Sequence, residues 1–142
     1  MTRAAAVVVL AAGAAVAADP PADLKAFGGK WALHAATLSG RDHLDDFAGM
    51  TLTVTGEKYA IEFGVNSDHG TITVDAAKSP KWIDITTRKD GPFKGRTLPG
   101  VYKFDGDLLV LCLDSEAKAR PTAFEAKEKT SVMLLTYKRA KK

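Results

Sequence analysis

Histidine and aspartate side chains gather in two polar stretches, where imidazole and carboxylate groups together would suit a transition-metal ion. His43 lies among three aspartates, and His69 follows Asp68. The spacing matches no recognised ligand motif, and neighbouring acids in a loop are usually solvated. We therefore predict no metal and no cofactor. Both histidines are kept as candidate residues of loops that surround a binding site.

A basic stretch, residues 87–99, is a second candidate site. Arg88, Arg96 and two lysines surround Phe93 there, an arrangement that suits an anionic ligand or a polysaccharide. The alternative is a solubilising loop, which we prefer. Arg120 either joins this patch or pairs with a nearby carboxylate, and the sequence leaves both possibilities open.

The single cysteine, Cys112, is a candidate nucleophile, but a reactive thiol should be exposed and electropositive. Cys112 lies in a run, residues 108–113, that is apolar on both faces. A strand with one wet face should alternate, so we predict a buried thiol, covered by a following segment that includes Pro121 and Phe124. No nucleophile elbow, His-Glu-x-x-His run or phosphate loop is present, and we predict that the protein is not an enzyme.

The N-terminus has the pattern of a cleavable signal peptide. Arg3 precedes an apolar run over residues 4–17 that ends in Ala15-Val16-Ala17, with small residues at the positions that signal peptidase requires. This run is shorter than the roughly 20 residues of a membrane-spanning helix. We predict a signal peptide over 1–17, cleaved after Ala17 or Ala18, a spacer over 18–28 and one domain over 29–140. The mature chain is expected to be exported, to the periplasm, the cell surface or the medium, with no membrane span.

The charge pattern gives little sign of a nucleic-acid partner. The formal net charge is +3, and charges of both signs are interleaved, whereas a nucleic-acid binder usually has a clustered basic face. We expect a monomer whose partners are a small apolar ligand or a component of the cell envelope.

Alternation of apolar and polar residues indicates an all-β fold. Sequential strands tend to be neighbours, and a closed antiparallel meander leaves no exposed edge. We therefore predict an eight-stranded, up-and-down barrel, with a short helix or turn left open in 41–48 or 115–128. The predicted strands are 30–38, 50–55, 58–63, 70–74, 82–86, 100–104, 108–113 and 131–139.

The predicted connections alternate in length. In a meander, the odd-numbered connections all lie at one end, so the long loops should surround a single mouth while the other end is tightly turned. The connections predicted to be long are 39–49, 64–69, 87–99 and 114–130.

The alternation also predicts which side chains face the barrel interior, and on the first strand Trp31, Leu33 and Ala35 share that face. An eight-stranded barrel either holds one small ligand or is filled by its own side chains. The aromatic residues among the inward set could fill it. As candidate ligand contacts we take Leu33, Leu52, Tyr59, Ile61, Phe63, Ile85, Tyr102 and Leu111.

Two features resemble the lipocalin superfamily. Gly29-Lys30-Trp31 opens the first strand and Arg139 closes the last. In that superfamily a Gly-x-Trp tryptophan plugs the closed end of the barrel and a late arginine packs across it. Antiparallel pairing of the first and last strands independently places Trp31 opposite Arg139, where a cation–π contact is feasible.

A closer resemblance covers nearly all of the mature chain. The ordered motifs Pro-x-x-Ile-Asp, Gly-x-Tyr, Gly-Asp-x-Leu-x-Leu-Cys and Arg-Pro-x-x-Phe, within residues 78–124, resemble a short lipocalin-like domain found in exported planctomycete proteins. Trp82 is bulkier than that pattern leads us to expect, and the first strand is rich in alanine. The family has no established activity, so the resemblance implies a fold and no function.

Two functions are compatible with these observations. The first is non-catalytic binding of a small apolar or amphipathic ligand inside the barrel. The second is a packed structural module that binds a protein or glycan through its long loops. A cavity of roughly 300 Å³ or more would favour the first, and a filled interior would favour the second.

Overall fold

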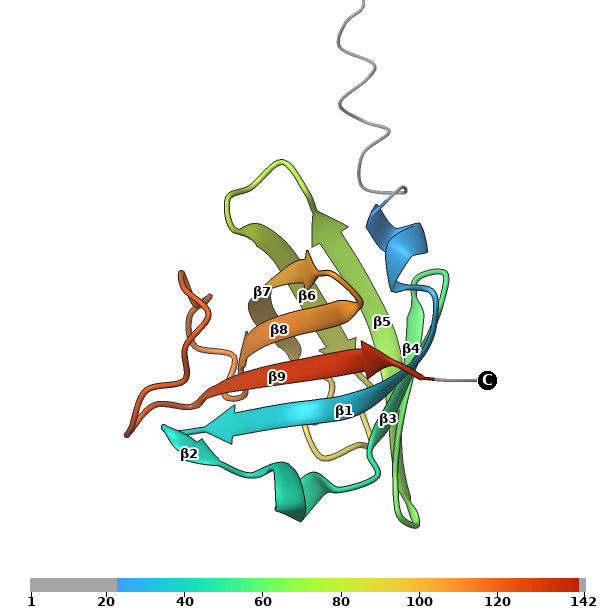
Figure 1. The fold of residues 1–142 in the computed structure, drawn as a ribbon, viewed down its shortest axis with the longest axis horizontal. Helices are drawn as coiled ribbons and strands as arrows, with labels where there is room; N and C mark the ends of the chain where they lie inside the picture. Colours follow the sequence, from blue (N-terminus) through green and yellow to red (C-terminus); the bar gives the residue numbers. More distant parts are fainter. Residues whose placement is uncertain (1–22, 141–142) are drawn as a thin grey trace, which may run out of the picture.

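The fold is a closed, eight-stranded antiparallel meander barrel, as predicted (Figure 1). A computed structural model describes residues 23–140. Each strand pairs with the next along the chain, and pairing of the first strand with the last closes the barrel. The two-residue strand β2 only extends one edge of the first strand. The strands are β1 (Gly29–Leu38), β2 (Arg41–Asp42), β3 (Thr51–Thr55), β4 (Lys58–Phe63), β5 (Asn66–Asp75), β6 (Lys81–Thr87), β7 (Thr97–Asp105), β8 (Leu108–Asp114) and β9 (Val132–Arg139).

Helical structure is confined to two short segments of the described chain. A 3₁₀ helix, η2 (Leu44–Phe47), lies in the first long connection, within one of the stretches where the sequence left a short helix open. Residues 23–27 form the second helical segment. Among the described residues, no helix is long and apolar enough to span a membrane. The predicted signal peptide, residues 1–17, lies outside the described residues.

Strand β5 is longer than predicted, which changes the mouth of the barrel. It begins at Asn66, and Phe63 of β4 pairs directly with Asn66. The connection between them is therefore a tight turn rather than the predicted long loop over 64–69. This prediction was wrong because the first residues of β5 are polar and have low strand propensity. Three long connections remain at the mouth: residues 39–50, 88–96 and 115–131.

A β-bulge in β1 shifts the inward face of that strand. Trp31 and Leu33 face inward as predicted, but the pairing with β9 is interrupted between Leu33 and Ala35. Because a bulge adds one residue to one strand, it reverses the alternation beyond it. Ala36 is consequently buried, whereas Ala35, predicted on the inner face, is exposed.

Trp31 and Arg139 close one end of the barrel. They are paired across β1 and β9, as predicted, and the guanidinium carbon of Arg139 lies 3.8 Å from the centre of the Trp31 ring. Arg139 also donates hydrogen bonds to the backbone oxygens of Gly28 and Ala26. The arginine therefore attaches the segment before β1 to the end of the last strand.

The helical segment 23–27 packs against this closed end, opposite the β4–β5 turn (Figure 1). The Phe27 ring makes edge-to-face contacts with Tyr102 and Phe104, with centroid separations of 5.0 and 5.1 Å. The indole nitrogen of Trp31 donates to the backbone oxygen of Phe27 at 2.7 Å. The Tyr102 hydroxyl donates to Asp23 at 2.6 Å. Part of the stretch treated above as a spacer is thus packed into the domain.

The segment after β8 covers the outer face of that strand, as the apolar pattern predicted. Cys112 is fully buried, and its thiol donates to the backbone oxygen of Glu125 at 3.6 Å. Phe124 lies under the ammonium group of Lys103 at 4.6 Å, and Pro121 in the same segment is half-buried. Burial raises the pKa of the Cys112 thiol, so the thiolate needed for nucleophilic chemistry is disfavoured.

Candidate functional site

The barrel encloses a cavity of about 480 Å³ between its closed end and its mouth. This volume lies within the range of roughly 300–1,000 Å³ that is usual for small-molecule sites. Most of the lining side chains are aliphatic or aromatic and come from all eight barrel strands, from the helical segment 23–27 and from two mouth connections. They include Leu52, Val54, Ile61, Phe63, Ile72, Ile83, Ile85, Leu98, Leu111, Leu113, Met133, Leu135 and Tyr137.

The cavity exists because the largest aromatic residues crowd the closed end. Trp31, Tyr102 and Phe104 pack there together with Phe27, and of these four only Phe27 borders the cavity. The strand residues that line the cavity are mostly aliphatic and leave the centre open. The interior is therefore filled at one end only.

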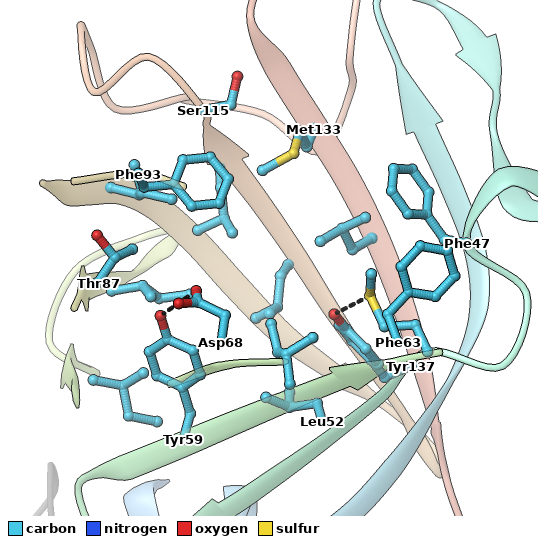
Figure 2. Close-up of a pocket in the computed structure, with 18 of the residues that line it drawn as sticks. Phe47, Leu52, Tyr59, Phe63, Asp68, Thr87, Phe93, Ser115, Met133 and Tyr137 are labelled. Carbon is cyan, nitrogen blue, oxygen red and sulfur yellow. Dashed lines mark hydrogen bonds between the residues drawn. The ribbon is translucent and has the colours of Figure 1, made fainter. Parts of the chain in front are cut away.

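Two aromatic side chains from the connections cover the mouth (Figure 2). Phe47 of η2 packs against Phe63 of β4, with ring centroids 5.7 Å apart. Phe93, in the connection 88–96, lines the cavity from another side. The sequence placed Phe93 in a basic patch and did not single out Phe47, since an isolated aromatic residue in a loop has no periodic signal.

The cavity wall has one charged side chain among its described residues, that of Asp68 on β5. The Tyr59 hydroxyl donates to Asp68 Oδ2 at 3.2 Å (Figure 2). Arg88 lies behind the carboxylate, with Nε 3.5 Å from Oδ1, and its Nη2 donates to the backbone oxygen of Ser67 at 3.1 Å. Burial and the neighbouring Asp68 carboxylate raise the pKa of Tyr59 above its usual range, so this tyrosine stays a hydrogen-bond donor.

Gly70 allows Tyr59 to reach Asp68. Tyr59 pairs with Gly70 across β4 and β5. A Cβ at position 70 would lie 2.9 Å from the Tyr59 ring and 2.0 Å from the backbone oxygen of Thr86. Only a residue without a side chain fits between the ring and strand β6.

The structure brings most of the predicted interior residues together around the cavity. Leu33 is half-buried and packs against the core without lining the cavity. Tyr102 is buried at the closed end, where its hydroxyl donates to Asp23. The other six line it: Leu52, Tyr59, Ile61, Phe63, Ile85 and Leu111.

The predicted mouth-loop residues do not form one site. His43 lies in the first connection and hydrogen-bonds Asp46 at 2.7 Å, whereas His69 is exposed on strand β5. Within residues 23–140, no three metal-ligating side chains lie close enough to hold an ion. Arg96 is exposed.

Arg120 is not at the mouth. It lies on the outer wall, where it pairs with Asp84 at 2.8 Å and donates to the backbone oxygens of Ile83 and Gly100. Its guanidinium carbon is 4.1 Å from the centre of the Trp82 ring. Of the two alternatives left open for Arg120, the structure supports pairing with a carboxylate.

The fold and cavity define a lipocalin-like eight-stranded barrel. No protein-family model matches the chain, and neither the curated proteins nor the solved structures contain a significant match.

Proposed function

We propose that the protein binds a small apolar or amphipathic molecule inside the barrel. The observation that carries the proposal is the cavity of about 480 Å³ with an almost entirely apolar wall. Transfer of apolar surface from water into such a site contributes roughly 25 cal/mol per Å² buried. A ligand with a hydrocarbon portion would gain most from this wall.

The alternative is a packed module that binds only through its loops. The open cavity supports this alternative less well than it supports ligand binding. A module needs no internal space, and protein interiors are normally packed with few voids larger than a water molecule. The open volume here exceeds the threshold of roughly 300 Å³ that separates the two functions.

We further propose that the mature protein is exported and that its binding is non-catalytic. Export rests on the signal-peptide pattern of residues 1–17. The apolar cavity wall supports holding a molecule rather than transforming it, since general acid–base or nucleophilic chemistry needs converging polar groups. Membership of the exported planctomycete lipocalin-like family is part of the same proposal and rests on the ordered motifs described above.

The neutral fluorescent probe N-phenylnaphthylamine provides a direct test. We expect the purified protein to bind it with increased fluorescence and a one-to-one stoichiometry. Native mass spectrometry of protein purified from its own host should in addition reveal a co-purifying small molecule. A folded protein that binds no apolar probe and carries no molecule would refute the proposal and favour the packed module.

A pair of variants locates the binding site. Ile61 lines the cavity, whereas the preceding Ala60 is exposed on the same strand. Ile61→Trp should fill the cavity and weaken probe binding at least tenfold. Ala60→Trp adds an indole to the outer face and should leave binding unchanged. Equal effects of the two substitutions would place the probe elsewhere.

A further inference from the structure

Asp68 is a largely buried carboxylate at the edge of a mainly apolar cavity. Its side chain is 14% exposed, and alternation along β5 turns it toward the same side as the buried Ile72. An ionised group in such a position is costly unless it is paired and hydrogen-bonded. The cost suggests that the carboxylate has a role in the cavity beyond packing.

Asp68 retains hydrogen-bonding capacity after its protein contacts are counted. An ionised carboxylate can accept about four hydrogen bonds, and Tyr59 supplies one, to Oδ2. Oδ1 and Arg88 Nε are both buried and face each other at 3.5 Å, yet neither makes a hydrogen bond to a described residue. The carboxylate is thus held by the charge of Arg88 and by one hydrogen bond from Tyr59, and it can still accept further hydrogen bonds.

Three of the other polar residues of the wall lie on β5 and β6 toward the mouth, on the same side as Asp68. Asn66 and Ser67 precede it on β5, and Thr87 ends β6 beside the connection 88–96. Deeper in the barrel the lining residues are aliphatic except for Phe27 and Tyr137, and the Tyr137 hydroxyl contacts the sulfur of Met50 at 3.9 Å. An amphipathic ligand would therefore lie with its hydrocarbon part inward and its polar head near Asp68.

Charge decides which head group fits there. The pair of Asp68 and Arg88 is neutral overall, but Asp68 lines the cavity and Arg88 does not. A carboxylate head would meet the like charge of the largely buried Asp68 carboxylate, which is unfavourable. A hydroxyl head donates to Asp68 without adding charge.

Resting on the proposed function, we propose that the cavity selects uncharged amphiphiles with a hydroxyl head, and that Asp68 is the residue that accepts the hydrogen bond from this hydroxyl. Tyr59 and Arg88 act as positioning residues in this scheme, because the Tyr59 hydroxyl donates to the carboxylate and Arg88 pairs with it. Fatty-acid carboxylates are the ligands against which the site discriminates.

Displacement of N-phenylnaphthylamine by three ligands of equal chain length tests this selection in the wild-type protein. Decanol has a donor head, methyl decanoate has an uncharged acceptor head and decanoate is an anion near neutral pH. Because a hydrogen bond to a charged group is worth about tenfold or more in affinity, decanol should bind about tenfold more tightly than methyl decanoate. Decanoate should bind most weakly. Decanoate binding as tightly as decanol would overturn the inference.

The Asp68→Asn substitution removes the negative charge from the cavity wall. It keeps the shape of the side chain and leaves Arg88 with only the exposed Asp90, 3.7 Å from its Nε, as a counter-charge. Decanoate should therefore bind about tenfold more tightly than to the wild type while decanol loses affinity. Asp45→Asn is the matched control, because Asp45 is an exposed aspartate of η2 outside the cavity wall. It makes the same change in net charge and should leave the order of affinities unchanged. Circular dichroism confirms that both variants are folded.

The outcomes separate the two proposals. If the wild-type protein binds none of the probes, the binding function itself fails. If it binds them without preference, or if Asp68→Asn changes the order no more than Asp45→Asn does, the binding function stands and the role of Asp68 is refuted. The wild-type comparison decides the question even where Asp68→Asn is unstable.

Discussion

Replacing Phe27 with alanine tests whether the helical segment 23–27 is part of the folded domain. As part of a passive spacer, Phe27 would contribute nothing to stability. In the structure its side chain is 1% exposed and packs edge-to-face against both Tyr102 and Phe104. Its backbone oxygen also accepts the Trp31 indole hydrogen bond, which a substitution of the side chain leaves in place.

The expected loss of stability follows from the size of the buried ring. Phenylalanine-to-alanine substitutions in a core cost about 3–5 kcal/mol, the value depending on how far the site can collapse. Phe27 lies at the end of the barrel and borders the cavity, so its ring is not packed on every side and we expect the lower value, about 3 kcal/mol. For a domain of this size, with a urea dependence of about 2 kcal/mol per M, the midpoint of unfolding should fall by about 1.5 M.

Urea unfolding followed by tryptophan fluorescence measures this shift, because Trp31 lies next to Phe27. Lys25→Ala is the matched control: Lys25 is exposed on the same helical segment, and surface substitutions usually change stability by less than about 0.5 kcal/mol. If Phe27→Ala and Lys25→Ala unfold at the same urea concentration as the wild type, the segment is a spacer and the packing argument is wrong.

Three further predictions concern other parts of the barrel. Cys112 should react slowly with a thiol reagent in the native protein and rapidly in denaturant, because it is fully buried and burial raises its pKa; fast native labelling would contradict this. Burial opposes ionisation of Asp114, but hydrogen bonds from Ser131 and from backbone N–H groups outweigh it and lower its pKa. The resulting stability is present above the ordinary carboxyl range near pH 4 and is lost as the pH falls through the lower folded value, so Asp114→Asn should flatten the fall of the urea midpoint below about pH 4. Gly70→Ala should destabilise the protein by at least about 2 kcal/mol, because the added Cβ would lie 2.0 Å from a backbone oxygen of β6. If the variant melts at the same temperature as the wild type, strands β5 and β6 can move apart more easily than their pairing implies.

The strands that could be predicted from the sequence are those whose inner and outer faces differ in polarity. Leu52 and Val54 on β3 alternate with threonines, and the structure buries both while leaving Thr55 exposed. The pairing of Trp31 with Arg139 also followed, since the register of two terminal strands is constrained once the barrel closes. Alternation of apolar and polar residues, together with closure of the barrel, was sufficient to predict the architecture.

The parts of the site that could not be predicted are those where tertiary contacts override local pattern. Asp68 was assigned to a loop because it lies among polar residues, and only pairing with β4 places it in a strand facing the cavity. The bulge in β1 follows Leu33 and cannot be recognised from the local residue types, so Ala35 was assigned to the wrong face. Phe47 reaches the mouth through the path of a long connection, which local sequence does not specify.

Closure of the barrel and opening of the cavity are two consequences of one uneven distribution of side-chain volume. Phe27, Trp31 and Tyr102 concentrate aromatic volume at the end where β1 and β9 meet Arg139, and this packing tolerates little change because interiors are close to crystalline density. The mouth half carries mainly aliphatic strand residues, with Phe47, Phe63 and Phe93 near the opening and Asp68 on the cavity wall. Substitutions at the closed end should therefore change mainly stability, whereas those around Asp68 should change mainly which ligand binds.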